Sequence, residues 1–187
     1  MRRTVLALIA LLPAIALAGC AVGPETVGGI LNRPLAAAPG TLDAGAAAKL
    51  ISQYRASRGL PPVAVDRRLT GIAGDHARRM ASADRVAHVL PGEGSFQQRL
   101  AASGFDAAIA AENIGAGYTS LADAFEGWRK SPDHNANLLR AGVSRIGIAV
   151  FNAPGSKYKS YWSLVLAEPY APLVGGPTAG PPMIFGR

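Results

Sequence analysis

The chain has 187 residues, a formal net charge of +7 and a single cysteine. One cysteine excludes an internal disulfide, so the folded part must rely on its hydrophobic core. The basic residues are scattered along the chain with no run of five or more. This argues against nucleic-acid binding, because proteins that bind nucleic acids usually gather their charge on one face.

The first twenty residues have the pattern of an export signal. Arg2 and Arg3 precede an uncharged apolar run that ends at Leu17-Ala18-Gly19-Cys20. A basic start, a short apolar core and small residues before a break describe a secretory signal peptide, and the run is too short for a membrane-spanning helix. The residues at the break resemble the lipobox of bacterial lipoproteins, in which the cysteine is lipidated. We predict a lipoprotein signal peptide at residues 1–19 and a lipid anchor on Cys20; the alternative is an ordinary signal peptide with a chance cysteine.

Composition divides the remainder into one domain between two irregular segments. Glycine and proline recur without a sustained period over residues 20–40 and again over residues 169–187, a composition typical of linkers. We predict a flexible tether at 20–40, a compact domain at 41–168 and an unstructured tail at 169–187. The domain is long enough to bury a substantial core, and we expect a monomer.

Helices are predicted for most of the domain. Apolar residues at helical spacing, with capping residues before them and glycine or proline after several of them, mark five segments. These segments cover about residues 42–58, 66–83, 95–103, 120–130 and 132–139. Ser131 and Pro132 place a capping hydroxyl before a proline at the first helical position. His76 falls on the apolar face of the second helix, where a histidine is more often a core residue than a ligand.

The pattern changes near the end of the domain. Residues 145–151 are rich in β-formers, residues 152–156 have turn composition, and residues 158–167 are again rich in aromatic and branched residues. This predicts an antiparallel hairpin. Several helices before a small antiparallel sheet indicate an α+β domain in which helices cover the sheet.

A series of short motifs accompanies these elements. They are Tyr54-Arg55-x-x-Arg58-Gly59-Leu60-Pro61-Pro62, Ala73-x-x-His76-Ala77-x-x-Met80, His88, Phe96-x-x-Arg99-x-x-x-x-Gly104, Glu112-Asn113-Ile114, Trp128-x-x-Ser131-Pro132-x-His134-x-x-Asn137-Leu138-Leu139, Ile146-Gly147-Ile148 and Tyr161-Trp162. In this order, over about residues 45–168, they resemble the CAP superfamily of cysteine-rich secretory proteins, antigen 5 and pathogenesis-related proteins, also called the SCP domain. The resemblance is closest to the short bacterial branch, and it implies an α-β-α sandwich with a groove across one face.

The resemblance also implies a site in this groove. In the wider family the groove is associated with two histidines and two acidic residues, and His88, Glu112 and His134 match three of those positions. Ser131 stands where longer members place the second acid, and its hydroxyl is a poor zinc ligand. Asp133 is close in sequence, but we expect it to point outward.

Other positions near the site are assigned structural roles. Ala111 precedes Glu112 where the family has glycine, and a positive φ there would cost alanine about 1 kcal/mol. We expect the side chains of Asn113 and Asn137 to tie loop backbone rather than touch a substrate. Three aromatic residues are expected in the core rather than in a lipid groove: Trp128, Tyr161 and Trp162.

Two interpretations of His88, Glu112 and His134 stay open. In one, His88 and His134 bind Zn²⁺ with Glu112 nearby, since imidazoles and a carboxylate form a known ligand set with an open position for water. In the other, which we prefer, the three side chains and Asn113 order the loops around the groove. A serine hydrolase is not expected, because the Ser131 hydroxyl should be engaged in capping and no Gly-x-Ser-x-Gly motif occurs.

We therefore expect a membrane-anchored lipoprotein of the cell envelope that is not an enzyme. Its groove, with His88, Glu112, His134, Asn113 and Ser131, would bind a lipid, a glycan or another envelope protein. The outer membrane is favoured where a cell has one, because alanine rather than aspartate follows Cys20. Two alternatives remain: a hydrolase acting on peptides or cell-wall polymers through the two histidines and the glutamate, with or without zinc, and a carrier of sterols or fatty acids.

Overall fold

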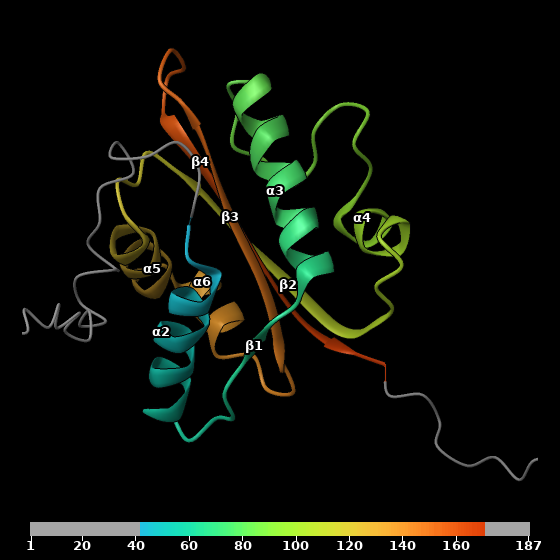
Figure 1. The fold of residues 1–187 in the computed structure, drawn as a ribbon, viewed down its shortest axis with the longest axis vertical. Helices are drawn as coiled ribbons and strands as arrows, with labels where there is room; N and C mark the ends of the chain where they lie inside the picture. Colours follow the sequence, from blue (N-terminus) through green and yellow to red (C-terminus); the bar gives the residue numbers. More distant parts are fainter. Residues whose placement is uncertain (1–41, 171–187) are drawn as a thin grey trace, which may run out of the picture.

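The computed structural model describes residues 42–170 (Figure 1). The predicted signal peptide, Cys20, the rest of the predicted tether to residue 40, residue 41 and the tail from residue 171 lie outside these residues. Along the described part the elements are α2 (Ala44–Ala56), β1 (Ala64–Val65), α3 (Arg67–Ser82), α4 (Phe96–Ala102), β2 (Ala107–Ala116), α5 (Leu121–Lys130), α6 (Pro132–Leu138), β3 (Arg145–Ala153) and β4 (Lys159–Pro169).

The four strands form one sheet in the order β1-β3-β4-β2. The predicted hairpin is confirmed as the antiparallel pair β3–β4, and β2 lies antiparallel to β4 on its other side. Sequence patterns missed β2 and the short β1, which pairs with β3 in parallel. The sheet is therefore mixed at one edge, and β2 forms its other edge.

Alternating residues of β4 divide the core into two halves, and this confirms the α-β-α sandwich (Figure 1). Trp162, Leu164 and Leu166 pack against α2, α5 and α6. Val165 and Ala167 point the other way and pack against α3 and α4. All five are fully buried, as expected for a strand with helices on both faces.

The three aromatic residues predicted to be in the core are buried. Trp128 and Trp162 belong to the half that faces α2, α5 and α6. Tyr161 belongs to the half that faces α3, where it packs with Met80 and Leu90. None of the three is more than 1% exposed, so they are unavailable to line an open groove.

The helix limits follow local capping, as the sequence predicted. Asp66 precedes α3 and accepts hydrogen bonds from the backbone N–H groups of Arg68 and Leu69. Ser95 and Gln98 form a reciprocal capping box at α4, which satisfies N–H groups that lack partners within the helix. Gly104, with a φ of +69°, follows this helix, in a conformation that glycine adopts without steric cost.

Close packing between α3 and β3 depends on Gly147. A Cβ atom at this position would lie 2.0 Å from the carbonyl carbon of Leu69 and 2.1 Å from the backbone nitrogen of Thr70. Because backbone atoms cannot move aside as a flexible side chain can, only glycine allows α3 to lie this near the sheet. This approach carries the buried face of α3, including His76, onto the sheet.

Candidate functional site

The candidate site is built around β2, where adjacent side chains point to opposite faces of the sheet. Glu112 points toward the α3–α4 side, where it contacts Arg99 and His88. Asn113 points toward α6, where its side-chain amide donates to the backbone oxygen of His134 at 3.0 Å. Because β2 is an edge strand, residues from both helical layers can meet around its open side.

Both carboxylate oxygens of Glu112 are occupied. His88 Nδ1 lies 2.9 Å from Oε2, and the Arg99 guanidinium donates to Oε1 at 2.9 Å and to Oε2 at 3.1 Å. Arg99 also donates to the backbone oxygen of His88 at 3.0 Å, which ties the loop to the pair. The side chains of Glu112 and Arg99 are 2% and 8% exposed, whereas that of His88 is 54% exposed. Only His88 therefore reaches solvent.

Burial alone would raise the pKa of Glu112. The hydrogen bonds from His88 and Arg99, together with the nearby charges of His76 and Arg99, outweigh burial and lower the pKa below its ordinary value. The lowered pKa favours the ionised carboxylate of Glu112, which the Arg99 guanidinium and His88 hold.

A second histidine–carboxylate pair lies directly behind the first. His76 Nδ1 is 2.7 Å from an oxygen of Glu93, and its Nε2 is 3.8 Å from Glu112. Arg99 lies between the two acids, since its Nε is 3.8 Å from Glu93. His76 is buried, as predicted, but it contacts carboxylates as well as apolar neighbours. The four buried side chains form one network, and His88 is its exposed end.

His134 approaches the site from α6 and is half-buried. The Asn137 amide donates to the side-chain oxygen of Asn113 at 3.0 Å, and Asn113 in turn holds the backbone of His134. The expected ties by the two asparagines are present. Asp133 is exposed, as expected, and contributes no ligand to the groove.

Three influences set the pKa of His134. Burial lowers it first, the charge of His88 lowers it further, and Asp133 raises it in part. We expect the midpoint of the His134 ring in an NMR titration to lie below the ordinary histidine value of about 6.5. Replacement of His88 by alanine should raise this midpoint, and Asp133→Asn should lower it. A midpoint that neither substitution moves would show that the two histidines do not share a groove.

The condition for a strain cost at Ala111 is not met, and the expectation that the Ser131 hydroxyl caps a helix is wrong. Within the described residues only Asp84 and Lys159 combine a side chain with a positive φ, so Ala111 is an unstrained residue of β2. Ser131 occupies the N-cap position of α6, but its hydroxyl makes no capping hydrogen bond. Its backbone oxygen accepts from Asn135 at 2.8 Å and begins the helix, while Pro132 at the first position has no N–H to be capped. The Ser131 hydroxyl therefore does not cap α6.

The donor set does not fit a three-ligand zinc site. Among the described residues no group of three or more His, Cys, Asp or Glu is arranged to hold a metal ion, and the Glu112 oxygens are bound to Arg99 and His88. A histidine whose Nδ1 faces a carboxylate can still offer Nε2 to a metal, with the carboxylate as an orienting partner. Zinc binding by His88 and His134 alone stays a prediction.

Sequence reasoning missed Glu93 and the pairing role of Arg99. Arg99 belongs to one of the motifs that carry the resemblance, and Glu93 lies in a Gly92-Glu93-Gly94 loop. A buried acid within a glycine-rich loop has no periodic signal, because its burial depends on the distant helix α3. The one sign in the sequence was Arg99, a charged residue at a fixed position of the motif that also contains Phe96 and Gly104.

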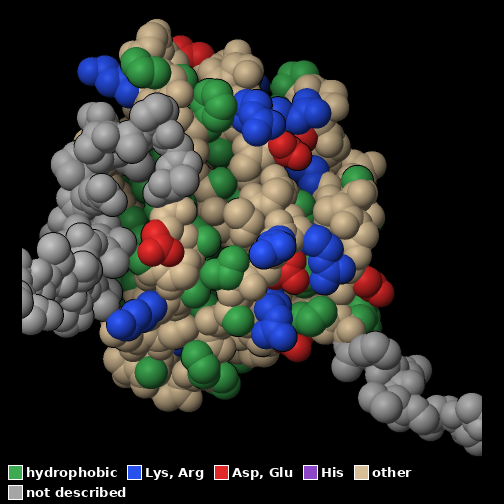
Figure 2. Space-filling model, viewed as in Figure 1, with side chains coloured by type: hydrophobic (Ala, Val, Ile, Leu, Met, Phe, Trp, Pro, Cys, Tyr) green, Lys and Arg blue, Asp and Glu red, His purple; other side chains and the backbone are tan. Residues whose placement is uncertain are grey.

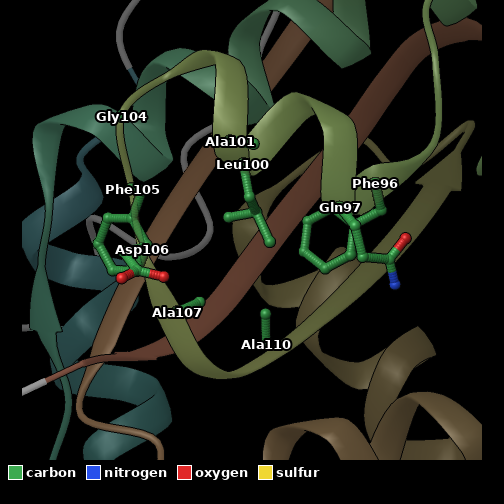
Figure 3. A pocket seen from close by; sticks show the side chains of 9 residues that line it. All are labelled: Phe96, Gln97, Leu100, Ala101, Gly104, Phe105, Asp106, Ala107 and Ala110. Carbon is green, nitrogen blue, oxygen red and sulfur yellow. The ribbon is translucent and has the colours of Figure 1, made fainter.

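A separate hollow of about 520 Å³ lies between α4 and the start of β2 (Figure 3). Phe96 and Phe105 stand at its two ends, with Leu100, Ala107 and Ala110 between them. No residue of the polar network lines it. The Arg99 guanidinium, which belongs to the network, lies 5.4 Å from the centroid of the Phe96 ring.

The protein is a three-layer α-β-α domain (Figure 1), and its candidate site pairs a histidine with a buried carboxylate at an edge strand. Residues 48–166, more than half of the chain, match the model of the cysteine-rich secretory protein family, CAP. The chain belongs to this family. No curated protein gives a significant match.

Solved structures show the same fold. An extracellular protein with an SCP domain from Bacillus anthracis is 22% identical, with a TM-score of 0.58, over 69% of this chain and 45% of that one. An outer surface protein from Borrelia burgdorferi is 18% identical, with a TM-score of 0.59, over 68% of this chain and 93% of that one. The chain thus spans less than half of the Bacillus protein. Residues 42–170 include no helix long and apolar enough to cross a membrane.

Proposed function

We propose that the protein is an extracytoplasmic CAP-domain lipoprotein whose groove binds an envelope component without catalysing a reaction. The observation that carries this proposal is the pairing of Glu112 with Arg99 and His88. A general base must be free to take a proton from its substrate, and a metal-ligating carboxylate must offer an oxygen. Both Glu112 oxygens are engaged by the three hydrogen bonds with His88 and Arg99, so its role is to hold His88 and the loop.

The location is supported by the sequence and by the relatives. Residues 1–20 have the pattern of a lipoprotein signal, and the two similar solved proteins are described as extracellular and as an outer surface protein. In cells fed labelled palmitate, the full chain should incorporate the label and sediment with membranes. A Cys20→Ala chain should do neither. Membrane association that survives this change would contradict the lipid anchor.

Binding by the groove can be tested with paired substitutions. A chain in which His88 and His134 are both alanine should lose at least about tenfold in affinity for envelope fractions, since His88 is 54% exposed and His134 is half-buried, and we place both imidazoles among the few contact residues whose truncation costs more than about 1 kcal/mol. A chain with Lys49→Ala and Lys130→Ala, on α2 and α5, is the control. Equal binding by all three chains would exclude the groove as the binding site.

One observation favours hydrolysis as the second candidate. A histidine oriented by a carboxylate through Nδ1, with Nε2 toward solvent, is a known arrangement for a general base, and His88 has this arrangement. Release of product from peptide or cell-wall polymer by the purified chain, abolished by His88→Ala, would establish the hydrolase and overturn the binding role. A stoichiometric sterol or fatty acid extracted from the purified chain would instead establish a carrier.

A further inference from the structure

The outward face of α3 carries a stripe of arginines. Arg67 and Arg78 are eleven residues apart, as are Arg68 and Arg79, and eleven residues are close to three helical turns. All four are exposed, while the opposite side of the helix is buried in the core. Arg85 follows the helix and is also exposed. We refer to these five residues as the α3 ridge.

The charge of the two helical layers is unequal. On α3 and α4 the exposed charged residues are the four arginines and Asp75, and the exposed positions of α4 are glutamine and alanine. In the helices of the other layer, the exposed Lys49, Arg129 and Lys130 are balanced by the exposed Asp123 and Asp133 and the partly exposed Glu126. The α3 layer thus has a helical excess of three positive charges, and the opposite layer has none. Figure 2 shows Lys and Arg side chains gathered near both ends of α3, with acidic groups among them.

Several acids lie within or beside the ridge and reduce its charge. Asp75 pairs with Arg78 at 2.8 Å, and Asp66 lies 3.4 Å from Arg68. Asp84 receives hydrogen bonds from the backbone nitrogen of Lys157 and from the Tyr161 hydroxyl. Asp106 is exposed beyond α4. Glu93, whose side chain is buried, lies 4.0 Å from Arg79. The hairpin tip adds Lys157 and Lys159, both exposed, so seven cations face these five acids and the face keeps a net positive charge.

Aromatic rings support two of the arginines. The Arg68 guanidinium lies 4.7 Å from the centroid of Phe105, and that of Arg78 lies 6.0 Å from the centroid of Phe151. Phe151 is itself 37% exposed. Such contacts limit the conformational freedom of the long side chains while leaving the charged groups at the surface, so less entropy is lost when the guanidinium groups meet an anion.

We propose that the α3 ridge is a docking surface for an anionic phospholipid bilayer. A helix of sixteen residues is about 24 Å long, so the ridge presents its arginines along a straight line that several lipid phosphates can meet at once. Arginine forms paired hydrogen bonds to phosphate oxygens. The inference concerns a surface separate from the groove and does not depend on what the groove binds.

The test uses a chain that begins at Ala21, because an acyl anchor on Cys20 would bind any vesicle and mask the ridge. Vesicles of phosphatidylcholine with one-third phosphatidylglycerol are compared with vesicles of phosphatidylcholine alone. The chain should sediment with the first and not with the second. Added salt should release it, since the Debye length falls to about 10 Å at 0.1 M.

Matched substitutions locate the surface. Each arginine near an anionic membrane is worth about fivefold in partition, so Arg78→Gln with Arg79→Gln should weaken binding by roughly twenty-five-fold. Arg129→Gln with Lys130→Gln removes the same charge from the opposite layer and should leave binding within about twofold. All four residues are exposed, and an unchanged circular dichroism spectrum shows that each variant is folded.

Three results would overturn the proposal. Equal weakening by the two double variants would show that net charge, and not the ridge, attracts the chain. Equal sedimentation with both kinds of vesicle would show that phosphatidylglycerol is not recognised. Tighter binding to dextran sulfate than to the anionic vesicles, lost in the ridge variant, would assign the surface to an acidic polymer instead of a bilayer.

Discussion

Replacement of Arg99 by methionine is expected to lower the free energy of unfolding by about 3–5 kcal/mol. Arg99 is the cation that joins the two buried acids, since it donates twice to Glu112 and lies 3.8 Å from Glu93. Removal of one member of a buried ion pair leaves an uncompensated charge in a medium that solvates it poorly. Methionine fills similar space, so the loss would come from electrostatics and not from a cavity.

Urea unfolding of the variant and of the unchanged chain measures this difference. Arg129→Met is the control, because its ion pair with Glu126 is on the surface and such pairs contribute little. The double variant Arg99→Met with Glu112→Gln should regain part of the lost stability, since it removes the charge that the first substitution left unpaired. A double variant less stable than Arg99→Met alone would show that Glu112 does not depend on Arg99.

The same network predicts how stability depends on pH. The pKa of Glu112 is lowered in the folded chain, so the unfolded chain binds a proton more readily. The stability contributed by Glu112 is then complete above the ordinary glutamate pKa of about 4.3 and is lost as the pH falls through the lowered value. In Arg99→Met the hydrogen bonds that lower this pKa are fewer, so the loss should be smaller and should be complete at a higher pH than in the unchanged chain.

Helices and the C-terminal hairpin could be predicted because each has a local signal. Asp66, Ser95 and Ser120 begin helices at the expected places, and the change of period after residue 144 marks β3. Strand β2 could not be predicted in this way. Half of its sequence, Ala107–Ala116, is alanine, and the strand is buried at its centre, so it lacks the alternation of polar and apolar residues that reveals a half-exposed strand.

Three residues of the candidate site could be predicted from the sequence, but the contacts that hold them could not. His88, Glu112 and His134 were found through the resemblance, and the structure brings His88 and Glu112 into contact. Their ionic partners were not found, because Arg99 lies thirteen residues from Glu112 and Glu93 lies seventeen from His76. Such spacings fit no helical or strand period, so these contacts exist only once α3, α4 and β2 have packed together.

Arg55 is predicted to be more important for folding than any residue of the groove. Its side chain is fully buried, and burial lowers its pKa by disfavouring the charged form. In place of a carboxylate it binds four backbone oxygens: Pro61 at 2.9 Å, Leu138 at 2.9 Å, Arg140 at 3.0 Å and Val143 at 3.1 Å. The guanidinium thereby joins the end of α2 to the segment between α6 and β3.

Replacement of Arg55 by methionine should therefore lower the free energy of unfolding by about 4 kcal/mol or more, because each buried carbonyl left without a donor costs about 1–3 kcal/mol. Arg55→Lys should recover only part of this loss, since one ammonium group cannot reproduce the planar fork of donors. Arg58→Met, three residues later and exposed, is the control and should change urea unfolding little.

Because Leu138 ends the helix that carries His134, Arg55→Lys should also move the His134 titration midpoint. A stable Arg55→Met chain with an unchanged His134 midpoint would show that the buried guanidinium does not position α6, and the groove would then owe its shape to the asparagine contacts on β2 alone.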